Sequence, residues 1–171
     1  MDGFGHFALG IAKSIENDLS KSGRPPDEGK SSATEQVLPF SIVSGTRGYI
    51  ENVVNQINGC YENGWFDACA VMMRRLVETL IIEAFEHNKI DAKIKNTNGD
   101  FFYLKDLIDK TLAETAWNLS RNTKRALPQL KGLGDLSAHN RRYLAHLGDI
   151  DKVKDALRVS TQELIYLAGL K

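Results

Sequence analysis

Residues 65–87 constrain the fold most, because their apolar side chains recur at helical spacing and cover more than one face of a helix. A helix that is apolar on several sides has to be covered on several sides. We therefore expect it to be the central, most buried helix of a bundle, with Leu76 and Leu80 almost fully buried. The apolar residues that carry the pattern are Cys69, Met72, Met73, Leu76, Val77, Leu80, Ile81, Ala84 and Phe85.

Other segments show the same periodicity. The repeat in residues 46–62 stops at Asn63 and Gly64, a helix-ending pair, which predicts a tight antiparallel pairing with residues 65–87. Residues 104–112 and 150–168 also keep helical spacing, and no strand-like alternation of useful length occurs in the sequence. The sequence predicts an all-α bundle of four to five helices, with the last helix packed beside the central one.

The helix boundaries in residues 118–136 are harder to predict, because this segment contains a proline and two glycines. Asn118 or Ser120 can cap a following helix. Pro128 is costly inside a helix, so we expect it to open one. Gly132 and Gly134 would then lie in mid-helix, where each costs roughly 1 kcal/mol relative to alanine. Either the helix breaks at these glycines or another backbone approaches closely there.

The first 36 residues differ in composition from the remainder. Residues 1–20 carry a narrow apolar stripe that predicts a helical arm, formed by Phe7, Ile11, Ile15 and Leu19. Residues 21–36 are rich in Gly, Pro, Ser and charged residues, as in a flexible linker. The bundle then comprises residues 37–171, and the arm could fold back on it or reach a second subunit.

Composition narrows the classes of protein. No apolar run approaches the roughly 18 residues of a membrane span, and the first residues do not resemble a signal peptide, so a soluble cytoplasmic protein is expected. Cys60 and Cys69 have no further cysteine partners for a zinc site, which favours two buried reduced thiols. Residues 1–100 hold 14 acidic and 10 basic groups, whereas residues 101–171 hold 8 and 12. The second part can therefore take an anionic partner.

Titratable and cationic side chains concentrate in residues 132–146. If the helix continues from about Leu136, then His139, Arg142 or Tyr143, and His146 lie on one of its sides, and Arg141 points elsewhere. A basic cluster with Asp135 as its only nearby acid is formed by Arg121, Lys124, Arg125, Lys131, Arg141 and Arg142. We expect these cations to bind nucleic acid.

Two segments together resemble the HEPN superfamily (higher eukaryote and prokaryote nucleotide-binding domains), in its bacterial branch of uncharacterised function. They are YENGWFDACAVMMRRLVETL and GLGDLSAHNRR, and the resemblance covers roughly residues 46–168. The family's first segment carries an Arg followed by a Glu, here Arg75 and Glu78, whose spacing also predicts a same-side ion pair. Its second segment carries a Gly-Asn/Asp-x-x-Ala-His motif, here Gly134, Asp135, Ala138 and His139.

The resemblance implies a nucleic-acid or nucleotide-directed protein of a bacterial defence or stress system. Active members of the superfamily are metal-independent ribonucleases with an Arg, a polar residue and a His. With His139 as that histidine, Gly134 takes the Arg position. With His146, Arg141 has the required four intervening residues, although its follower is Arg142. Residues five apart on a regular helix are about 140° apart, so this second placement needs a helix end or a partner subunit.

The chemistry of these side chains is consistent with RNA cleavage. A histidine can take a proton from a ribose 2′-hydroxyl or give one to the leaving oxygen, and a guanidinium can bind the phosphate. No metal or cofactor is required. We therefore expect His139, Arg141 and His146 to be catalytic, and Asp135 and Arg142 to lie beside them in one groove.

The alternative is a non-catalytic homodimeric interaction module in which the same residues hold a helix interface. Gly134 at the family's Arg position favours this alternative. A homodimer is expected, because the apolar stripe of the arm and the wide apolar face around Met72 and Met73 offer more apolar surface than a small bundle readily hides.

Overall fold

The computed structural model describes residues 36–171. In this range the chain forms five α-helices, two short 3-10 helices and no strand, apart from one isolated bridge between Lys95 and Phe101. The elements are η1 (Phe40–Ile42), α2 (Gly48–Glu62), α3 (Phe66–His87), η2 (Asp91–Ile94), α4 (Leu104–Ala113), α5 (Arg121–His139) and α6 (Leu147–Leu167). The all-α prediction is confirmed for these residues. The expected arm and all of the expected linker except Gln36 lie outside them.

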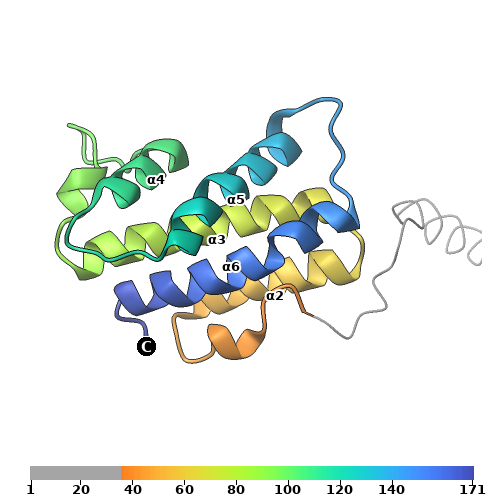
Figure 1. The fold of residues 1–171 in the computed structure, drawn as a ribbon, viewed down its shortest axis with the longest axis horizontal. Helices are drawn as coiled ribbons and strands as arrows, with labels where there is room; N and C mark the ends of the chain where they lie inside the picture. The colour runs from red at the N-terminus through yellow and green to blue at the C-terminus, as the bar shows by residue number, and fades with distance from the viewer. Residues whose placement is uncertain (1–35) are drawn as a thin grey trace, which may run out of the picture.

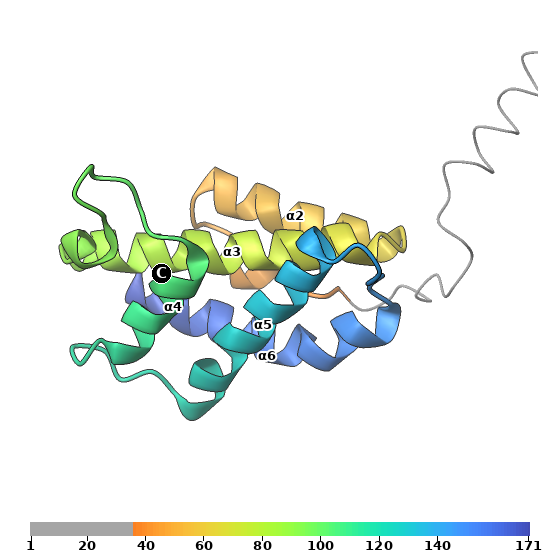
Figure 2. The same ribbon diagram turned by 90° about the horizontal axis from the view of Figure 1, so that it is seen from above.

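Helix α3 occupies the middle of the molecule. Helices α2, α3 and α6 run along the long axis, α5 crosses α3 obliquely, and α4 lies at the end where α3 stops (Figures 1 and 2). Contacts join α3 to α2, α4, α5 and α6. Leu76 and Leu80 are both 0% exposed, as predicted for the central helix. The last helix does pack beside it.

The turn between α2 and α3 forms at the predicted helix stop. Gly64 adopts a left-handed conformation with φ of 74°, which glycine accepts without a steric penalty. The amide of Trp65 donates to the carbonyl of Cys60 at 2.8 Å, and the Tyr61 and Phe66 rings meet edge to face with centroids 6.1 Å apart. These contacts fix the antiparallel α2–α3 pair.

Helix α5 begins earlier than Pro128, so the prediction that Pro128 opens the helix is wrong. The Ser120 hydroxyl caps α5 by accepting a hydrogen bond from the Thr123 amide at 3.2 Å, and Pro128 lies exposed in the helix interior. An interior proline costs about 3 kcal/mol, whereas burying a leucine contributes about 1.5–3 kcal/mol. Leu127 and Leu130 are both buried on the other face of α5, and their burial outweighs the cost of the proline.

Helix α5 ends at His139, so the condition that the helix continues to His146 is not met. Residues 140–146 form a turn and an extended connection. The Asn140 side-chain oxygen accepts a hydrogen bond from the Arg142 amide at 3.0 Å. Asparagine competes with the helical backbone in this way, which explains why the chain leaves the helix there. His139, Arg142 and His146 therefore do not share one face of a helix.

Both cysteines are free thiols in different surroundings. Cys69 is buried, and burial raises the pKa of its thiol to about 12, whereas Cys60 is only partly buried. The expectation of two buried thiols therefore holds for Cys69 alone. Within residues 36–171, no helix combines the length and apolar character needed to cross a membrane.

Candidate functional site

The close contact between α3 and α5 depends on Gly134. A Cβ atom at this position would lie 2.6 Å from the Arg74 Cβ and 3.1 Å from the Ala70 carbonyl oxygen. Side chains larger than hydrogen would force the two helices apart. The helix does not break at its glycines, so the expected close backbone approach is confirmed at Gly134. At Gly132, by contrast, a Cβ would meet nothing within 4 Å.

An ion-pair chain joins α3 to α5 beside this contact. The Arg74 Nε lies 2.8 Å from the Asp135 Oδ1, and the Lys131 Nζ bonds to the other carboxylate oxygen of Asp135. The Arg74 Nη1 also lies 3.7 Å from Glu78 Oε2. Asp135 therefore bridges two cations, one from each helix.

The predicted ion pair between Arg75 and Glu78 is wrong. Glu78 pairs with Arg74 at i,i+4 spacing, while Arg75 is exposed and has no ion pair with any residue in 36–171. The reason is tertiary, because Gly134 opens space for the stem of Arg74 against α5. Arg74 is the functional candidate that sequence reasoning missed. Gly134 was the signal that a neighbouring element comes close.

Opposing effects act on the Asp135 carboxyl. Partial burial raises its pKa, but the hydrogen bonds and positive charges of Lys131 and Arg74 outweigh burial. The pKa of Asp135 therefore lies below its ordinary value. Its side chain is 32% exposed, so the carboxylate is charged and within reach of solvent.

A shallow concavity of about 530 Å³ opens beside the ion-pair chain, and we name it the α5 concavity. It lies at the end of α5 and is lined by Gly132, Asp135, Leu136, His139, Asn140 and Arg141. Its volume is within the usual range for ligand sites, about 300–1,000 Å³. Three of the expected groove residues therefore line the same concavity, namely Asp135, His139 and Arg141. Arg142 and His146 do not line this concavity, so the prediction that all five share one groove is wrong.

The connection in residues 140–146 is held to the bundle at its far end. The Ala145 amide donates to Asp67 Oδ1 at 3.1 Å, and the Tyr143 hydroxyl donates to Asp149 Oδ2 at 3.2 Å. The His146 amide also donates to Asp149 Oδ2, at 3.1 Å, which places His146 at the N-cap of α6. This backbone hydrogen bond is the main reason why the pKa of Asp149 is lowered. His146 therefore belongs to the start of α6.

The first half of α5 presents a row of cations to solvent. Arg121, Lys124 and Arg125 are exposed, and none of them pairs with a carboxylate of the described chain. The same holds for Arg141 and Arg142 beyond the end of α5. Lys131 differs, because it is partly buried and bound to Asp135. Five of the predicted cations therefore remain uncompensated along α5 and the turn that follows.

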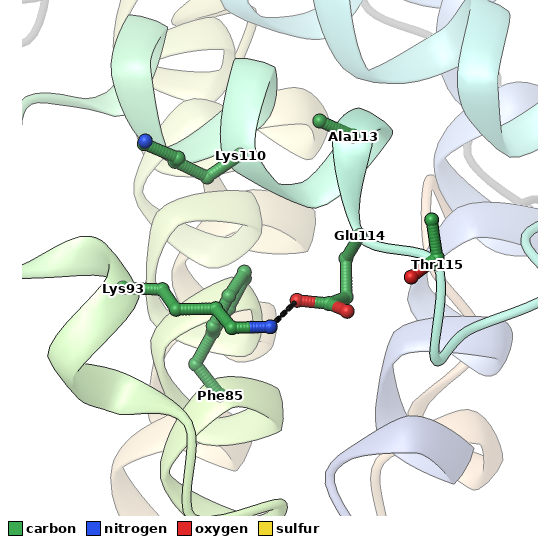
Figure 3. Close-up of a pocket in the computed structure, with 6 residues that line it drawn as sticks. All are labelled: Phe85, Lys93, Lys110, Ala113, Glu114 and Thr115. Atoms are coloured by element: carbon green, nitrogen blue, oxygen red, sulfur yellow. Dashed lines mark hydrogen bonds and ion pairs between the residues drawn. The ribbon is translucent and has the colours of Figure 1, made fainter.

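A second concavity lies at the opposite end of the bundle, and we name it the α4 pocket. It has a volume of about 270 Å³ and is lined by Phe85, Lys93, Lys110, Ala113, Glu114 and Thr115. Figure 3 shows Lys93 reaching across to Glu114, at an N–O distance of 2.7 Å. Lys93 and the Ala116 amide both hydrogen-bond to Glu114 and lower its pKa. Lys93 and Glu114 form a one-to-one pair here, and Lys110 is a further cation in the lining.

Comparisons with protein-family models, with curated proteins and with solved structures found no match to this chain. Among residues 36–171, no group of three or more His, Cys, Asp and Glu side chains is arranged to hold a metal ion. The α5 concavity and the cations that lead to it are therefore the candidate functional site of the described residues.

Proposed function

We propose that this chain is a HEPN-like, nucleic-acid-directed protein that binds single-stranded RNA along α5 and at the α5 concavity. The observation that carries the proposal is the row of exposed cations, Arg121, Lys124 and Arg125, on the helix that ends at the concavity; within residues 36–171 they pair with no carboxylate. Phosphates supply most of the affinity in such complexes by replacing bound counterions. A strand lying along α5 would bring one of its nucleotides to His139 and Arg141.

The lining of the concavity suits a nucleotide as well as a phosphate. Leu136 is 42% exposed beside the imidazole of His139, so an unstacked base has an apolar contact and a ring to stack on. The Arg141 guanidinium can bind a phosphate through two parallel hydrogen bonds. Apolar, aromatic and cationic groups within one concavity favour single strands, whose bases are free.

The HEPN-like assignment is supported by a contact between the two segments that carry the resemblance. Arg74 and Glu78 belong to the first segment, Gly134 and Asp135 belong to the second, and the pairs meet through the ion-pair chain. A bundle whose sequence motifs converge in space is a better candidate for a shared site than one whose motifs lie apart. This is the basis on which we extend the resemblance to function.

Ribonuclease activity is the catalytic form of the proposal. His139 would accept the proton of a ribose 2′-hydroxyl while that oxygen attacks the adjacent phosphorus. The bond from phosphorus to the 5′-oxygen then breaks, a 2′,3′-cyclic phosphate forms, and the leaving 5′-oxygen takes up a proton from solvent water. Arg141 would neutralise charge on the phosphate during attack. His139 and Arg141 are preferred over His146 because they line the same concavity.

RNA binding at several salt concentrations tests the proposal. The wild type should bind a single-stranded RNA oligonucleotide at low salt, and K124Q/R125Q should bind more weakly. Each phosphate contact contributes about 0.7 to the slope of log K against log salt for single strands, so losing two contacts should reduce the slope by about 1.4. The matched control is K105Q/K110Q, which removes two exposed cations from α4.

Fluorescence anisotropy of a labelled RNA measures the affinity of both double variants and its dependence on salt under identical conditions. The proposal requires K105Q/K110Q to keep the wild-type affinity and slope. If wild-type protein binds no RNA at low salt, or if both double variants lose affinity equally, α5 is not a nucleic-acid surface.

A homodimeric interaction module is the second candidate. Trp65 is 49% exposed and Leu144 is 69% exposed, and the Ala145 amide bonds to Asp67, so both apolar side chains lie near the start of α3. Exposed apolar groups that gather at one end of a bundle favour self-association. Light scattering at micromolar concentration should then give about twice the chain mass of 19.1 kDa, and W65S/L144S should return it to that mass.

A further inference from the structure

The ion-pair chain between α3 and α5 has no net charge, whereas the exposed cations of α5 and the following turn are not balanced by carboxylates of residues 36–171. Arg74 and Lys131 contribute two positive charges, and Asp135 and Glu78 contribute two negative charges. The four side chains are all partly exposed, between 23% and 34%. A group of this kind has no net charge to attract a phosphate while it is intact, although it contains two cations bound to Asp135, which lines the α5 concavity.

The two cations converge on one point, which is the carboxylate of Asp135. Arg74 reaches it from α3 and Lys131 reaches it from one turn earlier on α5, each binding a different oxygen. A phosphate diester presents the same features, because it carries one negative charge and two free oxygens that accept charge-assisted hydrogen bonds. Asp135 itself lines the concavity, so an incoming phosphate can reach the same donors.

The arginine is held in place independently of Asp135. Its stem packs over Gly134, where a Cβ atom would lie 2.9 Å from the Arg74 Cδ. Glu78 lies on the other side of the guanidinium, with a longer N–O distance of 3.7 Å. The packing of its stem therefore keeps Arg74 beside the position of the Asp135 carboxylate when the carboxylate moves aside.

We infer that Arg74 and Lys131 form a phosphate-binding site that the Asp135 carboxylate occupies in the free protein and gives up to a phosphate of bound RNA. This inference rests on the proposed function, because it adds two binding residues that contact Asp135, a residue of the same concavity. It extends the contact surface from the exposed cations of α5 to a site shared with α3. The carboxylate also makes the site selective, because only an anionic ligand that binds the two cations more favourably than Asp135 does can displace it.

The substitution Asp135→Asn tests the inference, because asparagine keeps the size and one oxygen acceptor but removes the charge. The phosphate then no longer has to displace a carboxylate, so RNA should bind about fivefold tighter at 0.1 M salt, which is about the contribution of one phosphate contact. Asp109→Asn is the matched control, since Asp109 also pairs with a lysine at i,i+4, on α4. It should leave RNA affinity unchanged.

A second variant keeps the test decisive if Asp135→Asn is unstable. Lys131→Gln preserves the contact between Arg74 and Asp135, and it should weaken RNA binding by about fivefold at 0.1 M salt. Unchanged affinity in either Asp135→Asn or Lys131→Gln, with the fold retained by circular dichroism, overturns the inference while the proposed function stands. If neither wild type nor Asp135→Asn binds RNA, the proposed function fails and the inference fails with it.

Adenosine monophosphate separates the two sources of phosphate. If Asp135→Asn tightens binding of the RNA oligonucleotide but not of the mononucleotide, the site takes a backbone phosphate, as proposed. Equal tightening for both probes would support the Arg74 and Lys131 site but assign it to a free nucleotide.

Discussion

The α5 concavity and the α4 pocket both place lysine beside a carboxylate, but the charges are arranged differently. In the α4 pocket Glu114 is matched by Lys93 and a backbone amide, and the volume of about 270 Å³ is below the usual range for ligand sites. In the α5 concavity Asp135 is shared by two cations, and Arg141 and His139 stand beside it. An ion pair alone therefore does not mark a site. Lys110 also lines the α4 pocket, so what distinguishes the α5 concavity is one carboxylate shared by two cations and the row of exposed cations on α5.

The largest expected effect concerns His139. If the α5 concavity cleaves RNA, His139→Ala should lower the rate by about 100-fold or more, as expected for loss of a general acid or base. Cleavage of a labelled single strand in the presence of a chelator measures this rate, and the product should carry a cyclic phosphate. His146→Ala is the matched histidine control and should retain most of the activity. The reverse result would move catalysis to the α6 N-terminus.

The packing behind the α5 concavity predicts opposite effects for two glycines. Gly134→Ala should destabilise the protein by about 1–3 kcal/mol, because the new Cβ would overlap Arg74 and the Ala70 carbonyl. Gly132→Ala should stabilise it by up to about 1 kcal/mol, because the position is helical and open. Urea unfolding of both variants measures the difference. Similar stabilities would mean that α3 and α5 are not in close contact.

Acid should weaken the ion-pair chain. The lowered pKa of Asp135 means that the folded protein binds its proton less readily than the unfolded chain, whose Asp pKa is about 3.9. This contribution to the free energy of unfolding is present above about pH 4 and is lost as pH falls through the folded-state pKa. Between pH 6 and pH 3, the melting temperature should therefore fall less for Asp135→Asn than for wild type. Equal falls in melting temperature for the two proteins would contradict this expectation.

The smallest expected effect separates the two regions most directly. Glu114→Gln removes the carboxylate of the α4 pocket, as Asp135→Asn does in the α5 concavity, but among the described residues that line this pocket the one cation besides Lys93 is Lys110. RNA affinity of Glu114→Gln should equal that of wild type in an anisotropy titration. If the two variants tighten binding alike, net charge and not local arrangement governs the interaction.

Much of the fold could be predicted from the sequence because it depends on periodic burial. The apolar residues of α3 recur on several faces, so its central position follows from hydrophobic burial alone, and Asn63 with Gly64 mark the turn before it. The start of α5 could not be predicted in this way. A local rule assigned Pro128 to a helix start, whereas the Ser120 cap and two buried leucines decided otherwise.

The residue types of the candidate site were determined by the sequence alone, while their partners were decided only by the tertiary structure. His139, Arg141 and Asp135 stand out in any reading of residues 132–146, because titratable and cationic groups concentrate there. Arg74 joins them only because Gly134 lets α3 approach α5. His146 separates from them because Asn140 ends the helix. Side-chain chemistry is local, but which charges meet depends on how closely two helices can pack.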